Sequence, residues 1–386
     1  MRAFTWESVV VLLSVAAMAA AHGAAPAARS VPASTTTREH LEQPAWWPTR
    51  QVADQRQFVG ERTCAECHGA IARTQVETQM ARTMMPAADS SLIAAHTGLI
   101  FTDGQYRYRL SHEKGLTLTV SDGTHDMVAP VQWAFGSGEI AQGYGWWEQG
   151  QFYESRFNYY GTTHGFDRTP GRLADAPASL ENALGRQVAG FEVRTCYACH
   201  ASALTTAEPL TAAHFQPGIT CEGCHGPGLA HVEAKRAGDW QNADIVNPAN
   251  LSPAASVDFC GACHGTPKDV ALMGFVGKLT VRFPAYRLEK SRCWGTSGDA
   301  RLRCFACHNP HQPLEKDAAA YDAACLRCHA RAADRVDVAG GRLEACPVAK
   351  SRCTSCHMPK VTLSGMHYAF ADHDIRIVKP GAGFPD

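Results

Sequence analysis

The chain has 386 residues, and its 36 lysines and arginines nearly balance its 37 aspartates and glutamates, which gives a formal net charge of −1. A balanced charge without a polybasic stretch argues against nucleic acid as a partner. Beyond the amino terminus no run of about 18 apolar residues occurs, so the sequence predicts no membrane span in the mature protein.

The amino terminus has the pattern of an export signal over residues 1–25. Arg2 supplies a positive charge, residues 9–21 are apolar apart from Ser14, and mostly small residues follow. This apolar run is too short to span a bilayer. We therefore expect a cleaved signal peptide and a periplasmic or secreted protein, with an uncleaved membrane anchor as the alternative. Residues 26–55 are rich in Ala, Pro, Thr and Gln without periodicity, which predicts a flexible leader.

The next predicted segment, residues 56–97, begins with the pentapeptide Cys-x-x-Cys-His at residues 64–68. Beyond it, apolar side chains recur at helical spacing, at Ile71, Val76, Met80 and Met84. This spacing predicts a single helix with one apolar face, ended by Pro86.

Residues 98–185 are unusually rich in aromatic side chains. Fourteen of the chain's 33 aromatic residues lie between residues 101 and 166. Apolar and polar residues alternate over 106–110 and again over 116–120, with a short loop between, which predicts a β-hairpin. Residues 152–160 predict a further strand. We expect a β-rich segment whose aromatic residues pack in its own core, and a substrate-binding role for them is the alternative.

From residue 186 to residue 386 the same pentapeptide returns six times. The seven cysteine pairs are Cys64 and Cys67, Cys196 and Cys199, Cys221 and Cys224, Cys260 and Cys263, Cys304 and Cys307, Cys325 and Cys328, and Cys353 and Cys356. The histidines that directly follow them are His68, His200, His225, His264, His308, His329 and His357. A shuffled chain of this composition would contain about 0.03 copies, so the repetition is not accidental.

Two thiols and an adjacent imidazole at this spacing are the attachment signature of c-type haem. The thiols add across the two vinyl groups of the porphyrin, and the imidazole binds the iron as its proximal ligand. A zinc knuckle or a redox dithiol explains one cysteine pair, but not a histidine after every second cysteine. We therefore predict seven covalently attached haem c groups.

The six later motifs are too closely spaced for a conventional apolar core, because they leave about 27 residues for each haem. The predicted fold is a multihaem cytochrome c. Haems form the core of residues 186–386, wrapped by short helices and loops, and the β-rich segment lies between haem 1 and haems 2–7. Helices are predicted over residues 229–237 and 321–336.

Two cysteines, Cys293 and Cys346, lie outside the motifs. An oxidising compartment favours a disulfide between them. Two separate thiols, or a role for either as an iron ligand, are the alternatives.

Several stretches resemble the secreted multihaem c-type cytochromes that contain a cytochrome c-552/4-type domain. They lie at residues 135–138, 166–171, 218–228, 245–248, 304–311 and 353–360. The resemblance runs from about residue 64 to residue 385 and implies electron transfer through haems with two histidine ligands, without identifying a substrate. Members often have a histidine shortly after the first motif, where this chain has Met80.

An iron that only carries electrons needs a second, distal axial ligand. The candidates are His231, His311, His367, His373, His214, His164 and Met80, the last for haem 1. The resemblance implies His231, His367 and His373. His311 follows His308 by three residues, too few to pass round the same ring, so we expect it to bind a neighbouring haem.

Two main functions remain open, with a redox or gas sensor as a third. An electron carrier needs two strong ligands on every iron, whereas a multihaem oxidoreductase of a small nitrogen or sulfur compound needs one haem with an open face. In known multihaem reductases, the motif that binds the catalytic haem often has lysine in place of the histidine. No motif in this chain has that lysine, and this favours the electron carrier. The expected partners are other cytochromes or a membrane quinol oxidoreductase, and the protein is expected either to act alone or to assemble into an oligomer or filament.

Overall fold

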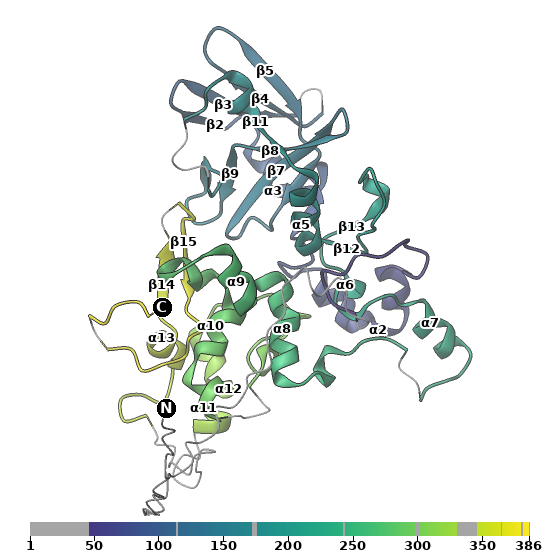
Figure 1. Cartoon of the computed structure of the whole chain (residues 1–386), viewed down its shortest axis with the longest axis vertical. Helices are drawn as coiled ribbons and strands as arrows, with labels where there is room; N and C mark the ends of the chain where they lie inside the picture. Colours follow the sequence, from purple (N-terminus) through teal and green to yellow (C-terminus); the bar gives the residue numbers. More distant parts are fainter. Residues whose placement is uncertain are drawn as a thin grey trace, which may run out of the picture. The chain divides into compact units, whose positions relative to one another are not determined.

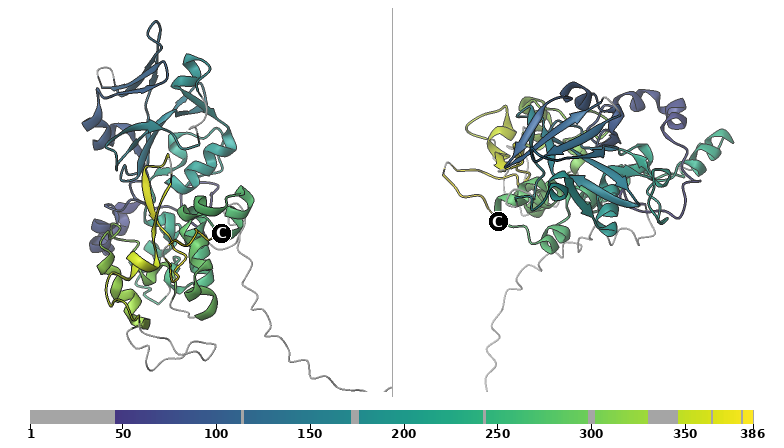
Figure 2. Two further views of the ribbon diagram at one scale, coloured as in Figure 1. Left: turned by 90° about the vertical axis from the view of Figure 1, so that its left-hand side faces the viewer. Right: turned by 90° about the horizontal axis from the view of Figure 1, so that it is seen from above.

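The computed structural model describes residues 46–112, 115–171, 176–241, 244–297, 302–329, 346–363, 365–379 and 381–385 (Figure 1 and Figure 2). The predicted signal peptide and the leader up to residue 45 lie outside the described residues. All described residues belong to one unit, 34–386. Within the described part of the chain, no helix has the length and apolar character needed to cross a membrane.

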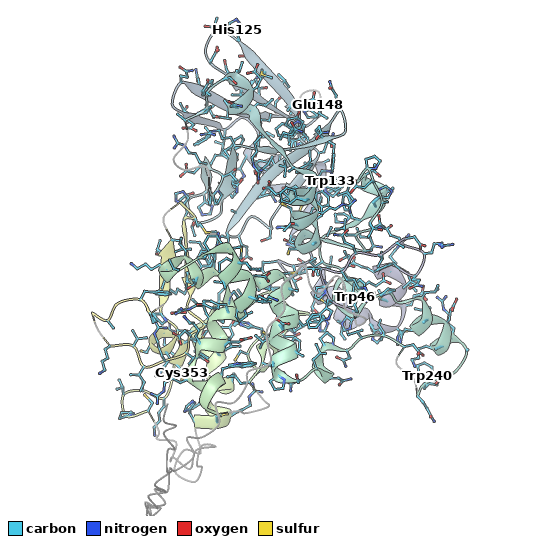
Figure 3. The ribbon with its side chains drawn as sticks, viewed as in Figure 1. Trp46, His125, Trp133, Glu148, Trp240 and Cys353 are labelled. Atoms are coloured by element: carbon cyan, nitrogen blue, oxygen red, sulfur yellow. The ribbon has the colours of Figure 1, made fainter. Side chains whose placement is uncertain are left out.

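The last ten residues of the predicted leader, 46–55, make specific contacts, so this part differs from the expected flexible chain. The indole Nε1 of Trp46 donates to the carbonyl oxygen of Gly223 at 3.3 Å (Figure 3). Trp47 is buried with its ring centre 5.4 Å from that of Phe259. Two tryptophans bury a large apolar area, which holds this stretch against the motif-bearing region.

The first motif lies in helix α2 (Glu61–Gln75). The helix ends earlier than the apolar spacing predicts, and the chain continues through β1 (Met84–Pro86), η1 (Ala87–Asp89) and α3 (Ser91–His96). Met84 is 1% exposed and its backbone pairs with Phe135 in a sheet. Long-range strand pairing therefore overrides the local helical pattern at this point.

The β-rich segment contains two antiparallel sheets (Figure 2). The first is a meander of β2 (Ile100–Asp103), β3 (Tyr106–Ser111), β4 (Thr117–Ser121) and β5 (Asp126–Pro130). Leu110 lies opposite Leu118 in the register of β3 and β4, which confirms the predicted hairpin. Buried and exposed residues alternate along β3, as expected for a sheet with one face in the core.

The second sheet joins β1 to six later strands. These are β6 (Trp133–Phe135), β7 (Ala141–Glu148), β8 (Gln151–Ser155), β9 (Phe157–Tyr160), β10 (Gly165–Arg168) and β11 (Gly185–Val188), with helix α4 (Leu180–Leu184) before β11. The single strand predicted over residues 152–160 is two strands, because Arg156 interrupts it and directs its buried guanidinium to Asp103. Tyr108 and Phe157 pack edge to face at 5.3 Å in the core between the sheets. The aromatic residues thus build the segment's own core, as predicted.

The remaining residues form mainly short helices and loops, as predicted for this region, together with two strand pairs that were not predicted. Its elements are α5 (Gly190–His200), β12 (Ala201–Ser202), η2 (Ala212–His214), β13 (Gln216–Pro217), α6 (Cys221–His225), α7 (Leu229–Arg236), η3 (Pro248–Asn250), α8 (Pro253–His264), α9 (Pro267–Met273), η4 (Gly277–Arg282), α10 (Pro284–Lys290), α11 (Arg292–Ser297), η5 (Cys304–Ala306), η6 (Ala318–Tyr321), α12 (Asp322–His329), α13 (Cys353–His357), β14 (Lys360–Leu363) and β15 (Tyr368–Ala371). Helix α7 confirms the helix predicted at residues 229–237. Helix α12 covers the start of that predicted at 321–336, and the rest lies outside the described residues.

The apolar core of this region is small. Residues 188–215 share a buried cluster with Met84 and Phe152. The cluster separate from it within the described residues has three buried members, Val257, Ala285 and Leu288, and a few partly buried residues packed against them. So small a cluster cannot balance the conformational entropy of ordering the chain around it. The region therefore needs another source of buried apolar surface.

Candidate haem sites

Six of the seven motifs lie in an α-helix, and the fifth begins the 3-10 helix η5. They lie in or next to α2, α5, α6, α8, η5, α12 and α13. Five of these helices end at the motif histidine, and in α2 His68 has non-helical backbone angles (φ −107°, ψ 32°). Cysteines three residues apart lie on one face of a helical turn, and the backbone change at the histidine lets its ring leave that face. This is the arrangement that two thioether bonds and one axial ligand require of five residues.

Three motif histidines are oriented by a backbone carbonyl. The Nδ1 atoms of His200, His225 and His357 donate to the carbonyl oxygens of Thr83, Val246 and Arg376 at 2.8, 2.7 and 2.9 Å, respectively. A proton held on Nδ1 leaves the Nε2 lone pair for a metal. Burial lowers the pKa of His200, which keeps its ring in the neutral form that binds iron.

Three of the motif histidines face a second imidazole ring. His68 faces His231 with ring centres 6.4 Å apart, His225 faces His311 at 6.0 Å, and His308 faces His373 at 6.2 Å. Two imidazoles bound on opposite sides of one iron, with iron–nitrogen bonds of about 2.0 Å, have ring centres about 6.3 Å apart. The rings of these pairs therefore fit a single iron between them, and the second ring of each pair is a candidate distal ligand predicted from the sequence.

The other histidine candidates have different surroundings. The Nε2 atom of His367 lies 2.7 Å from a carboxylate oxygen of Asp167. His214 closes the capping box of η2, where its Nδ1 accepts the backbone N–H of Thr211 at 3.2 Å. His164 is exposed, with Nδ1 3.4 Å from the hydroxyl oxygen of Tyr159. None of these three forms a ring pair with a motif histidine in the described part of the chain.

The methionines after the first motif differ in burial. Met80 is partly buried, and its carbonyl oxygen accepts the backbone N–H of Ile219 at 3.0 Å. Met84 packs in a buried cluster with Tyr197 and Phe215. Met84 is therefore a core residue.

A buried ion-pair network surrounds His373. Arg287 donates from Nε and Nη2 to the two carboxylate oxygens of Asp372, at 2.8 and 3.0 Å, and from Nη2 to Asp374 at 3.2 Å. Arg376 donates to Asp372 at 2.6 Å. Burial raises the pKa of Asp372, but the hydrogen bond and charge of Arg287, with the backbone N–H of Asp374 and the hydrogen bond from Arg376, outweigh it and the net pKa is lowered. Burial also lowers the pKa of His373 to about 4, so its ring is neutral near neutral pH.

Thiols from different motifs lie close together. Side-chain interactions join Cys64 to Cys221, Cys199 to Cys263, Cys260 to Cys304, and Cys325 to Cys353. Motif 1 thus contacts motif 3, motif 4 contacts motifs 2 and 5, and motif 6 contacts motif 7. The first motif is distant in sequence from the third but adjacent to it in space.

The two cysteines outside the motifs are both among the described residues, and no disulfide joins them. Cys346 is exposed. Burial, and secondarily the nearby Cys328, raise the pKa of Cys293. The disulfide between Cys293 and Cys346 that the sequence favoured is therefore not present in the structure.

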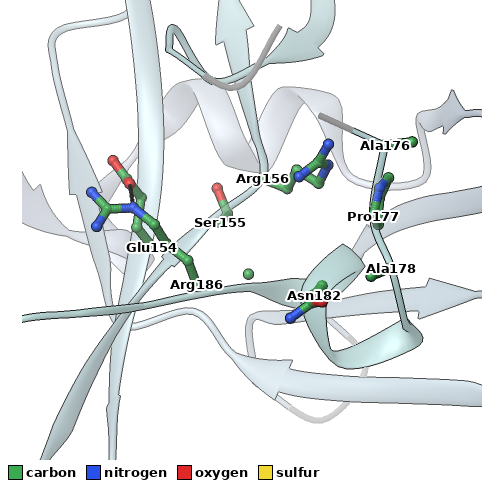
Figure 4. A pocket seen from close by; sticks show the side chains of 9 residues that line it. Glu154, Ser155, Arg156, Ala176, Pro177, Ala178, Asn182 and Arg186 are labelled. Atoms are coloured by element: carbon green, nitrogen blue, oxygen red, sulfur yellow. Dashed lines mark hydrogen bonds and ion pairs between the residues drawn. The ribbon is translucent and has the colours of Figure 1, made fainter. Parts of the chain in front are cut away.

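A cavity of about 200 Å³ lies in the β-rich segment and is separate from the motif residues (Figure 4). Its lining includes Arg156, Asn182 and Arg186, but no motif cysteine or histidine. Arg186 is engaged by Glu154 at 2.8 Å and also by Glu192.

Two comparisons place these features beside known proteins. Residues 171–226, which contain the second and third motifs, match the family model described as cytochrome c554 and c-prime. The match supports a multihaem c-type cytochrome. A search of curated proteins found no match.

Two solved structures are similar to the chain. The outer cell wall cytochrome OcwA is 15% identical, with 83% of this chain and 80% of that chain covered and a TM-score of 0.49. The undecahaem cytochrome from the S-layer of Carboxydothermus ferrireducens is also 15% identical, with 86% and 54% covered and a TM-score of 0.40.

Proposed function

We propose that this protein is a seven-haem c-type cytochrome that transfers electrons in the periplasm or outside the cell. The observation that carries the proposal is the set of three facing imidazole pairs, with ring centres 6.0 to 6.4 Å apart. In each pair a motif histidine meets a histidine from another element. Such a separation has no packing advantage for two imidazoles in water, but it matches two ligands of one iron.

The seven cysteine pairs hold the porphyrins, and the seven motif histidines are the proximal ligands. The distal ligands of motifs 1, 3 and 5 are His231, His311 and His373. With His231 opposite His68, motif 1 needs no thioether ligand from Met80. His164, His214 and His367 stay predictions for the motifs without a facing ring among the described residues.

When bound, haem iron with two imidazole ligands supplies one-electron chemistry with little rearrangement on redox change. The chain's own contribution is to fix the ligands. The Nδ1 atoms of His200, His225 and His357 are held by backbone carbonyls, which sets each ring's orientation. Burial keeps His200 and His373 neutral and limits water at their rings.

The thiol contacts between motifs support electron transfer within three groups, which are motifs 1 and 3, motifs 2, 4 and 5, and motifs 6 and 7. Because Cys64 interacts with Cys221 and Cys260 with Cys304, porphyrins attached to these cysteines would be neighbours. Other cytochromes or a membrane quinol oxidoreductase are the proposed partners.

The test is the near-infrared magnetic circular dichroism of the purified holoprotein, oxidised and reduced, with a haem count per chain by the pyridine method. The electron-carrier proposal expects seven haems, all low-spin. A high-spin fraction of about one haem in seven would instead favour an oxidoreductase with one open iron. Turnover assays with small nitrogen and sulfur compounds would then decide between the two.

A further inference from the structure

Glu222 lies between the two cysteines of the third motif, and only 1% of it is exposed. Its carboxylate accepts three backbone hydrogen bonds. Oε1 accepts from Val59 at 2.9 Å and from Gly228 at 2.8 Å, and Oε2 accepts from Gly60 at 2.9 Å. Hydrogen bonds to an ionised carboxylate are about twice as strong as those between neutral groups.

The three donors stand at the beginnings of two different helices. Val59 and Gly60 directly precede α2, and Gly228 directly precedes α7. Neither helix has a capping hydrogen bond from its own N-cap side chain, because both N-cap residues are glycines. Glu222 therefore supplies from a third helix, α6, the acceptor and the negative charge that the starts of α2 and α7 favour.

These two helices carry the facing rings of the first motif. His68 lies on α2, His231 lies on α7, and their ring centres are 6.4 Å apart. The helix starts are also closely packed. A Cβ atom on Gly228 would lie 3.0 Å from the side chain of Val59 and 3.1 Å from Oε1 of Glu222. The backbone N–H of Leu229 donates to the carbonyl of Gln57 at 3.0 Å.

We propose that Glu222 is a positioning residue for the axial histidine pair of the first motif. The inference rests on the proposed function, because it takes His68 and His231 as ligands of one iron. A residue of motif 3 thereby sets the ligand separation in motif 1. Loss of the carboxylate leaves three backbone N–H groups without their acceptor and releases the starts of α2 and α7 from each other.

The chain offers a matched control inside the first motif. Glu66 also lies between the two cysteines of its motif, and it also joins α2 to α7, through Arg236 at 2.9 Å. This ion pair is exposed, with 60% and 65% of the two side chains accessible. Exposed ion pairs contribute little, so Glu66→Ala removes a carboxylate from the same helix pair without loss of positioning.

The experiment compares four holoproteins, His231→Ala, Glu222→Ala, Glu66→Ala and the double variant Glu222→Ala/His231→Ala. The readouts are the high-spin signal in magnetic circular dichroism and the number of carbon monoxide molecules bound by the reduced protein. Relative to the unaltered protein, His231→Ala is expected to add one high-spin, carbon monoxide-binding haem per chain. Glu222→Ala is expected to affect that same haem, the double variant to add no second one, and Glu66→Ala to add none.

Each outcome decides a different point. An unchanged spectrum for His231→Ala overturns the axial pair and with it this part of the proposed function. A high-spin haem in His231→Ala but not in Glu222→Ala overturns the positioning role alone. If Glu222→Ala does not accumulate as holoprotein, the positioning role is tested with Glu222→Gln instead. Gln keeps one acceptor oxygen, so a partial high-spin fraction is expected, and a fully low-spin spectrum overturns the inference.

Discussion

Arg287 and Asp372 form a two-point ion pair in which neither side chain is exposed, with nitrogen–oxygen distances of 2.8 and 3.0 Å. The pair joins α10 to the segment after β15, one residue before His373. A buried ion pair is tolerated only when its geometry satisfies both charges. The ion pair between Arg287 and Asp372 therefore fixes the backbone next to His373.

Replacement of Arg287 by Met is expected to destabilise the protein by about 3–5 kcal/mol, because Asp372 is left as a buried charge without its main partner. The measurement is denaturant unfolding of the holoprotein. The control is Lys316→Met, which removes an exposed partner of Glu139 at 3.2 Å and is expected to cost about 0–1 kcal/mol. Equal effects of the two substitutions would contradict the role of the buried pair.

His311→Ala and His373→Ala are each expected to convert one further haem to the high-spin state. The reason is that each ring lies at the separation expected for a second ligand, 6.0 and 6.2 Å from the motif rings of His225 and His308. Resonance Raman spin-state bands of the oxidised protein measure the change. His125→Ala is the control, since that side chain is 76% exposed. A spectrum that stays low-spin in His311→Ala would remove this histidine from the ligand set.

The stability of the protein is expected to fall between about pH 4.5 and pH 7 through Glu289. Burial, and secondarily the charge of Asp258, raise the pKa of Glu289 from 4.5 to about 7. A group whose pKa is raised on folding stabilises the folded state fully below its unfolded pKa, and this contribution is lost as pH rises through the folded pKa.

Glu289→Gln should remove this loss, so the variant gains stability relative to the unaltered protein near neutral pH and above, but not at low pH. Unfolding free energies measured across this pH range give the comparison. Glu148→Gln, at an exposed position on β7, provides the control. Parallel pH profiles for the unaltered protein and Glu289→Gln would show that Glu289 does not titrate in this way.

Without haem, the β-rich segment is expected to remain folded while the motif-bearing region does not. The segment has a continuous aromatic and aliphatic core, whereas the separate cluster around the fourth motif has three buried members among the described residues. Limited proteolysis of haem-free chain should yield a resistant fragment of about residues 84–188. Proteolysis at equal rates throughout would contradict an independent core.

Asp103→Ala tests whether a buried ion pair inside the β-rich segment is needed for its independent stability. Asp103 is 4% exposed and accepts hydrogen bonds from Arg156 at 3.4 Å and from Arg168 at 2.9 Å. Its removal leaves a buried guanidinium unpaired and is expected to abolish the resistant fragment. Asp126→Ala on β5, at an exposed position, should leave the fragment intact.

Local patterns predicted the local features. The alternation around Tyr108 and Leu118 predicts the β3–β4 hairpin, and the pentapeptides predict where cysteines and histidines share a helical turn. The helical spacing that ends at Met84 predicts the wrong element, because Met84 pairs with Phe135 in a sheet assembled from distant strands. The spacing pattern contains no information about that partner.

The contacts between motifs depend on the tertiary fold, so they could not be predicted from short stretches of the sequence. Glu222 sits at a variable position of its pentapeptide, and only the approach of Val59 and Gly228 makes it an acceptor of three hydrogen bonds. Its signal in the sequence was a charged residue next to a motif cysteine. Arg287 gave no sequence signal at all, since its partners lie more than eighty residues away.

The facing rings of His68 and His231 are separated by 162 residues of chain. Because a ribosome adds residues from the amino end, α2 is complete before β1 to β11 exist and long before α7 is made. A flexible connection of this length carries a closure entropy that grows with its length. Once the β-rich segment has folded on its own core, residues 84–188 no longer contribute to that flexible length. The segment then acts as a preformed connector, and the two histidines meet after a shorter conformational search.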